Sequence, residues 1–113
     1  MYSLEFYRTQ NGKVPIEEFI DEQDARTKKK IYDDFDFLKS IGPKAREPKV
    51  KFLGDGIFEL RINQGKYIRI LYFFFSGRKI VVTNGFVKQT NKTPRNEIER
   101  AKRYRADYIE RRK

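Results

Sequence analysis

The chain has 113 residues, of which 26 are basic and 16 acidic, so its net charge is +10, and it contains neither cysteine nor histidine. This composition excludes disulfides, thiolate metal sites and the common zinc sites, which leaves Lys, Arg, Tyr, Asp and Glu for any chemistry. The longest apolar run, Ile70–Phe75, is too short to span a bilayer, and no secretory segment is evident. We therefore expect one cytoplasmic domain over residues 1–113 with a single core.

The N-terminal half predicts one strand and two helices. Tyr2–Tyr7 alternates between apolar and polar residues, as a strand does. Pro15 suits the first position of a short helix. Asp24 is placed to cap a second helix, whose apolar residues recur at helical spacing until Gly42-Pro43 ends it.

The C-terminal half predicts four strands and a last helix. The strands are expected at residues 50–53, 57–63, 67–75 and 78–87, with glycine-containing turns between them. Thr93 is expected to cap a helix that begins at Pro94. The whole pattern predicts an α+β fold: an N-terminal strand, a helical pair, a mostly antiparallel sheet of four to five strands and a C-terminal helix.

All of the excess positive charge lies in the second half of the chain. Residues 1–56 carry 11 basic and 11 acidic side chains, whereas residues 57–113 carry 15 and 5. This asymmetry favours a polyanionic partner, because neutralisation of phosphates supplies most non-specific affinity for nucleic acids. A basic surface that serves only solubility is the alternative.

The candidates for chemistry are cations on the predicted strands and in the loop that follows them. Arg61 and Arg69 lie opposite the apolar stripes of their strands, and antiparallel pairing would bring both toward Lys88 if the register allows. A salt bridge to Glu59 is the structural alternative for a strand arginine. Lys92 follows Lys88 in a polar loop before a helix N-terminus, which is either an anion site or an ordinary exposed connection.

Such a cluster of cations suits cleavage of RNA by its own 2′-hydroxyl. This reaction needs a base for the hydroxyl, stabilisation of the charged phosphorane and a proton for the leaving 5′-oxygen. Arginine stays charged and suits the stabilising role, whereas a lysine acts as a base only if its surroundings lower its pKa. An aromatic ring such as that of Tyr67 could stack on an exposed base. The residues alone leave the general base unassigned.

Three motifs carry a resemblance to a known family. Glu-Leu-Arg ends at Arg61, Tyr-x-Arg-Ile-x-Tyr spans residues 67–72, and Gly-Phe-x-Lys-x-Thr-x-Lys-Thr-Pro spans residues 85–94. Together they resemble the HigB-like, phage-derived branch of the RelE/ParE toxin superfamily. The resemblance implies a RelE-like fold and a type II toxin that cleaves mRNA on the 70S ribosome to inhibit translation, without a metal or other cofactor. It also implies a cognate antitoxin with a helix-turn-helix domain and no membrane partner.

The resemblance also assigns roles to residues. Arg69 matches the family's arginine that contacts the scissile phosphate, and Lys88 and Arg61 match its basic positions, so these three are the expected catalytic residues. Lys92 matches a further basic position of the family, and apart from the resemblance we also expect Tyr67 and Arg95 to bind RNA. Two other functions stay open: a ParE-like poison of DNA gyrase, which shares the fold, and a non-catalytic basic module that binds nucleic acid.

Overall fold

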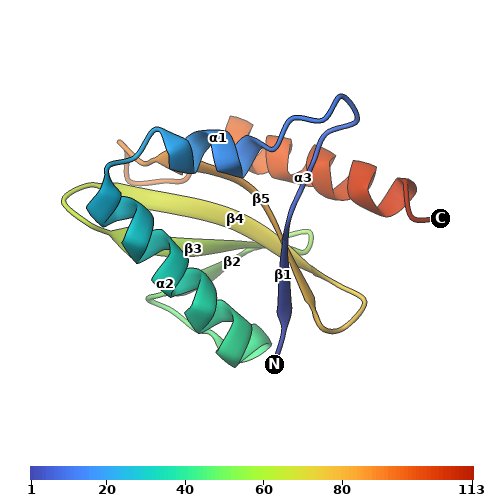
Figure 1. Cartoon of the computed structure of the whole chain (residues 1–113), viewed down its shortest axis with the longest axis horizontal. Helices are drawn as coiled ribbons and strands as arrows, with labels where there is room; N and C mark the ends of the chain where they lie inside the picture. The colour runs from blue at the N-terminus through green and yellow to red at the C-terminus, as the bar shows by residue number, and fades with distance from the viewer.

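The computed structural model describes residues 1–113 and confirms the predicted α+β fold (Figure 1). Its elements are β1 (Ser3–Phe6), α1 (Pro15–Asp21), α2 (Ala25–Ile41), a 3₁₀ turn (Gly42–Lys44), β2 (Val50–Gly54), β3 (Ile57–Asn63), β4 (Tyr67–Phe75), β5 (Lys79–Val87) and α3 (Arg95–Glu110). None of the helices combines the length and the apolar character needed to cross a membrane.

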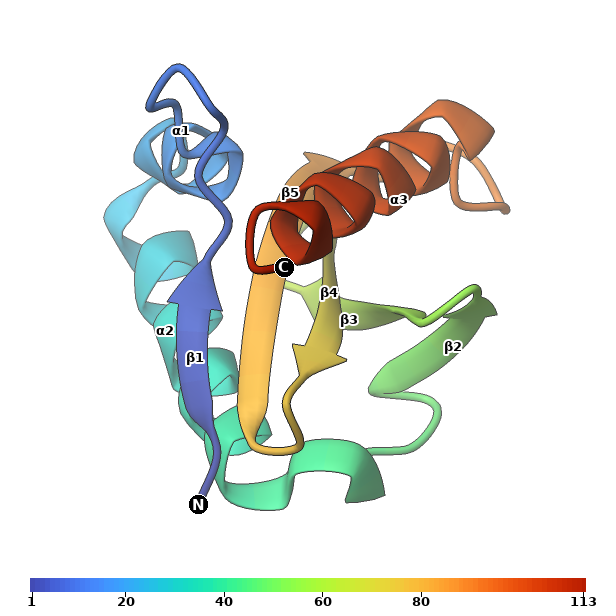
Figure 2. The same ribbon diagram turned by 90° about the vertical axis from the view of Figure 1, so that its right-hand side faces the viewer.

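The five strands form one mixed sheet in the order β1-β5-β4-β3-β2. Strands β2 to β5 are antiparallel neighbours, and β1 adds to β5 in parallel. Figure 2 shows α2 and α3 on opposite sides of β5. The helical pair thus covers one face of the sheet, and α3 covers part of the other.

Each face of the sheet has its own apolar core. Ile16 and Leu38 bring α1 and α2 against residues such as Ile70 on one face. Ala101 and Tyr108 bring α3 against Leu71 and Phe73 on the other. Because β4 is central and covered on both faces, its sequence is apolar at successive positions instead of alternating.

The helix starts confirm two predictions and correct a third. Pro15 is the first residue of α1, and the side chain of Asp24 accepts a hydrogen bond from the main-chain N–H of Thr27 at 2.7 Å. The prediction that Thr93 caps α3 was wrong, because Pro94 occupies the N-cap position and no side chain caps the helix. The hydroxyl of Thr93 instead donates to the carboxylate of Glu59, a charged acceptor that makes a stronger hydrogen bond than a neutral one.

A β-bulge in β5 sets which side chains face α3. Val82 pairs with Tyr72, but the register then shifts, so that Asn84 pairs with Leu71. The extra residue is Thr83, whose hydroxyl donates to the carbonyl of Leu71 at 3.1 Å. Because side chains alternate between faces, this single extra residue moves the even-numbered residues of β5 from the face of α2 to the face of α3.

Candidate functional site

The register of β3, β4 and β5 places the predicted strand cations on the same face of the sheet. Arg61 pairs with Arg69, which in turn pairs with Phe86 of β5. Lys88 follows Phe86 by two residues and therefore shares its face, and its main-chain N–H donates to the carbonyl of Tyr67 at 2.7 Å. Without the bulge, Lys88 would point to the opposite face, so the bulge is what joins it to Arg69.

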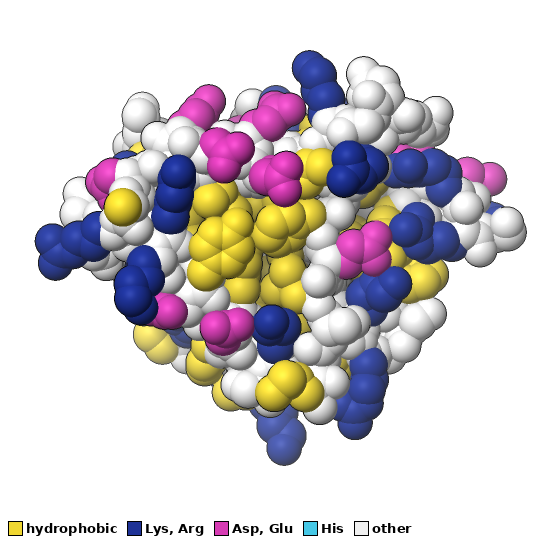
Figure 3. Space-filling view, viewed as in Figure 1, with side chains coloured by type: hydrophobic (Ala, Val, Ile, Leu, Met, Phe, Trp, Pro, Cys, Tyr) yellow, Lys and Arg dark blue, Asp and Glu magenta, His cyan; other side chains and the backbone are white.

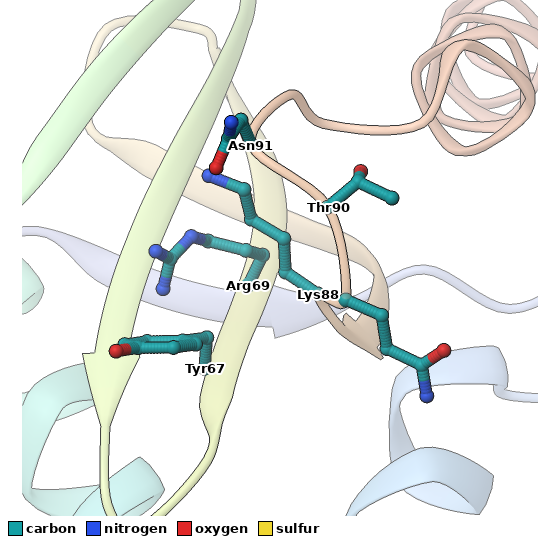
Figure 4. Close-up of a pocket in the computed structure, with 6 residues that line it drawn as sticks. Tyr67, Arg69, Lys88, Thr90 and Asn91 are labelled. Atoms are coloured by element: carbon teal, nitrogen blue, oxygen red, sulfur yellow. The ribbon is translucent and has the colours of Figure 1, made fainter.

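An open pocket of about 380 Å³ lies where these residues meet, beyond the N-terminal end of α3 (Figure 4). Its lining residues are Tyr67, Arg69, Lys88, Gln89, Thr90 and Asn91. In Figure 4 the side chain of Lys88 reaches across Arg69 toward Asn91, and the ring of Tyr67 lies on the other side of Arg69. The pocket thus has two cations between an aromatic ring and an amide.

Arg69 is a buried cation with no carboxylate partner. Its side chain is only 6% exposed, and none of the ion pairs in the chain includes it. One terminal nitrogen donates to the side-chain oxygen of Asn63 at 3.1 Å and to the carbonyl of Ile68 at 2.9 Å, while the buried Nε has no acceptor. Burial lowers the pKa of Arg69, and the negative charge of Glu59 opposes that shift. The guanidinium nevertheless stays charged at neutral pH, as arginines in proteins do.

Arg61 is on the same face but in a different electrostatic environment. Its Nε lies 3.2 Å from the buried carboxylate of Glu59, and its Nη1 lies 3.9 Å from Glu47. Arg61 does not line the pocket. The salt bridge that was the alternative for a strand arginine therefore exists, but it is made by Arg61 and not by Arg69.

Tyr67 and Lys88 are both more accessible than Arg69. The ring of Tyr67 is 59% exposed, and its centroid lies 5.8 Å from the guanidinium carbon of Arg69. Lys88 is half-buried and takes part in no ion pair. An exposed ring next to unpaired cations can accept a stacked base while the cations contact its phosphate.

The structure does not bring Lys92 and Arg95 into the pocket. Both are exposed, and Arg95 is the first residue of α3. Sequence reasoning singled out the lysines of the loop and missed Asn91, which lines the pocket, and Asn63, which holds Arg69. The polar character of the loop was the available signal for Asn91. No signal marked Asn63, because its role depends on strand pairing.

The pocket offers donors and positive charge, which suit an oxyanion. A phosphate oxygen could accept from Lys88 or from the part of the Arg69 guanidinium that lines the pocket, and charge-assisted hydrogen bonds of this kind are short and strong. No group of three or more acidic side chains is arranged to hold a metal ion. The donors and the positive charge of the pocket support stabilisation of a phosphate by side chains.

A second groove, beside β1, has a different character. It is lined by Leu4, Phe6, Val14, Arg8 and Glu17. Figure 3 shows apolar side chains at the centre of this face, ringed by both basic and acidic ones. Because the two charges in the groove are of opposite sign, it has no net preference for an anion, unlike the pocket at Arg69.

Comparison with protein families gives one match. The model of the family described as phage derived protein Gp49-like (DUF891) matches residues 18–106, which include α2, the strands β2 to β5 and most of α3. A comparison with curated proteins finds no match.

Proposed function

The chain belongs to the family of Gp49-like phage-derived proteins, and from that premise we propose that it is the toxin of a type II toxin–antitoxin system, formed by one domain over residues 1–113. Membership of the family is consistent with a toxin of this class. We propose further that the toxin is an mRNA endoribonuclease of the RelE/HigB type. It acts in the cytoplasm on mRNA bound to the 70S ribosome, and a cognate antitoxin holds it inactive.

The observation that carries the nuclease proposal is the unpaired Arg69. Burying a cation without a carboxylate costs stability, so a buried arginine that lines a pocket and makes no ion pair marks a site where an anion is expected to bind. The anion must fit beside Lys88 and the exposed ring of Tyr67. A phosphate with an adjoining base on single-stranded RNA has both features.

The proposed reaction is attack of a 2′-hydroxyl oxygen on the adjacent phosphorus. The O–P bond to the 2′-oxygen forms, the bond from phosphorus to the 5′-oxygen breaks, and the products are a 2′,3′-cyclic phosphate and a 5′-hydroxyl. One proton leaves the 2′-hydroxyl and one reaches the 5′-oxygen, so the reaction needs no added water. Arg69 and Lys88 stabilise the additional negative charge of the phosphorane, and Tyr67 orients a neighbouring base.

The experiment is controlled expression in bacteria of the wild type, Arg69→Gln, Lys88→Gln and a control, Arg26→Gln. Arg26 is exposed on α2, takes part in no ion pair and lies outside the pocket. Growth, amino-acid incorporation and the 5′ ends of mRNA are measured after induction. Loss of one preorganised donor to a transition-state anion typically costs about 100- to 1,000-fold in rate, so Arg69→Gln should abolish the growth arrest.

We expect the wild type and Arg26→Gln to stop translation and to produce cuts only in mRNAs that are being translated. Normal growth at confirmed expression would overturn the assignment as a toxin. Arrest with DNA damage and intact mRNA would instead identify a gyrase poison. Uniformly weaker RNA binding without any cleavage would identify a non-catalytic module.

A further inference from the structure

Glu59 is a buried carboxylate on the same face of the sheet as the candidate site. It is only 1% exposed and lies in β3 beside Arg61, on the face that carries Arg69. One of its oxygens lies 3.2 Å from Nε of Arg61, and the other accepts from the hydroxyl of Thr93. A buried carboxylate is tolerated only when charges and hydrogen bonds compensate it, and here the two partners come from different parts of the chain.

Thr93 lies at the end of the loop that forms one wall of the pocket. This loop, residues 88–93, connects β5 to α3 and supplies four of the six lining residues. At its start, the main-chain N–H of Lys88 donates to the carbonyl of Tyr67. At its end, the hydroxyl of Thr93 makes the only side-chain hydrogen bond between the loop and the sheet, because the hydroxyl of Thr90 donates to Lys92 within the loop.

We propose that Glu59 and Thr93 are a positioning pair that holds the loop over Arg69 and so sets the distance between Lys88 and the guanidinium. Neither residue lines the pocket, so both act through the loop and not on the substrate. The inference deepens the proposed nuclease function and rests on it for its catalytic consequence. Its structural consequence, a loop fixed at both ends, is independent of that function.

The physical reason is the entropy of the loop. The packing of α3 on the sheet anchors the far end of the loop, but without the hydrogen bond of Thr93 residues 88–93 would sample more conformations, and a cation on the loop would meet the phosphate in the productive place for less of the time. The hydrogen bond to a charged and buried acceptor is strong enough to restrict this motion. Arg61 then has a defined part in the arrangement, because its ion pair with one oxygen of Glu59 leaves the other oxygen to accept from Thr93.

The test compares Thr93→Val, which removes the hydroxyl at nearly constant volume, with Thr93→Ser, which keeps it. Thr9→Val is the control, since Thr9 makes hydroxyl hydrogen bonds in a distant exposed turn. The activity readout is the cleavage rate of a short mRNA on 70S ribosomes. The structural readout is hydrogen exchange of the main-chain N–H groups of residues 88–93, with thermal melting to confirm that each variant is folded.

We expect Thr93→Val to lower the maximal cleavage rate by about 10- to 100-fold, with a smaller change in KM, and to speed exchange in the loop. Thr93→Ser should restore both. In a Glu59→Met background, Thr93→Val should cause no further loss, because the hydroxyl no longer has its acceptor.

The outcomes separate this inference from the proposed function. If the wild type cleaves mRNA and Thr93→Val cleaves equally fast, the positioning pair is refuted while the nuclease assignment stands. If the wild type does not cleave, the nuclease assignment fails and hydrogen exchange decides: faster exchange in Thr93→Val supports the pair, and unchanged exchange overturns it. A loss that Thr93→Ser does not restore would also overturn it.

Discussion

The hydroxyl of Tyr7 joins the segment after β1 to the last turns of α3. It donates to the carboxylate of Asp107 at 2.5 Å, and that carboxylate also accepts from Gln10 at 2.8 Å and pairs with Arg111 at 2.7 Å. The side chain of Tyr7 is only 3% exposed. We predict that Tyr7→Phe lowers the free energy of unfolding at neutral pH by about 1.5–3 kcal/mol, the usual range for a hydrogen bond to a charged group.

This loss should depend on pH in a defined direction. Burial, and then the hydrogen bond to the negative Asp107, raise the pKa of Tyr7 from 10.0 to about 12. Folding therefore favours the protonated hydroxyl, so its contribution is fully present below pH 10 and is lost as the pH rises through about 12. The difference between a pKa of 10.0 and a pKa of about 12 corresponds to about 3 kcal/mol of unfolding free energy. The difference in the free energy of unfolding between the wild type and Tyr7→Phe should thus fall nearly to zero as the pH rises through this interval.

The assay is urea unfolding, followed by circular dichroism, at a series of pH values from neutral to beyond 10. Tyr72 and Tyr108, whose pKa values burial also raises, are present in both proteins and cancel in the difference. Tyr32→Phe is the control, because Tyr32 is 46% exposed and its hydroxyl makes no hydrogen bond, so the substitution removes no comparable contact. A difference for Tyr7→Phe that stays constant over the whole range would refute the reasoning.

Three further predictions concern packing, the bulge and the charge of the site. Gly85→Ala should lower the free energy of unfolding, measured in urea, by about 1–3 kcal/mol, because the new Cβ would lie 2.8 Å from the ring of Phe19. Unchanged stability would show that α1 can move away. Thr83→Val should lower the free energy of unfolding, measured by thermal melting, by about 1–3 kcal/mol, because the buried carbonyl of Leu71 loses its hydroxyl donor at the bulge. Unchanged stability would show that this hydrogen bond does not stabilise the bulge. The affinity for single-stranded RNA, measured by fluorescence anisotropy, should depend less on salt in Arg69→Gln: the slope of log affinity against log salt concentration should fall in magnitude by about 0.7. An unchanged slope would mean that Arg69 contacts no phosphate.

Local signals in the sequence were sufficient for the elements of the fold. Asp24 and Pro15 mark helix starts, because a capping hydrogen bond and a fixed backbone angle act within one helical turn. Alternating apolar residues mark strands buried on one face, and continuous apolar runs mark strands buried on both. The prediction that Thr93 caps α3 was wrong because of a contact far away in the sequence. Its hydroxyl bonds to Glu59, 34 residues earlier in the chain, and no local rule for helix caps can anticipate a competing acceptor of that kind.

The site was predictable in its residue types but not in its assembly. Alternation within each predicted strand places Arg61 and Arg69 opposite the apolar stripes, so the two share a face if the register allows. Lys88 could not be placed in the same way, since a one-residue bulge at Thr83 decides its face and nothing in the sequence of β5 announces the bulge. Which arginine pairs with Glu59 is settled only by the side-chain contacts of the structure, in which Arg61, two residues further along the same strand, makes the ion pair.

The candidate site is located more narrowly by which basic side chains lack a carboxylate partner than by the net charge of the second half of the chain. The sequence places all of the excess positive charge in residues 57–113, but many of those cations face carboxylates: Arg61, Lys79, Arg100, Lys102, Arg111, Arg112 and Lys113. Arg69 and Lys88 are among the eight that do not; of those eight only Arg69 is buried, and it shares one pocket with Lys88. Because a buried cation without a counter-ion opposes folding, an oxyanion in this pocket would supply the missing charge, so ligand binding and the free energy of unfolding should rise together.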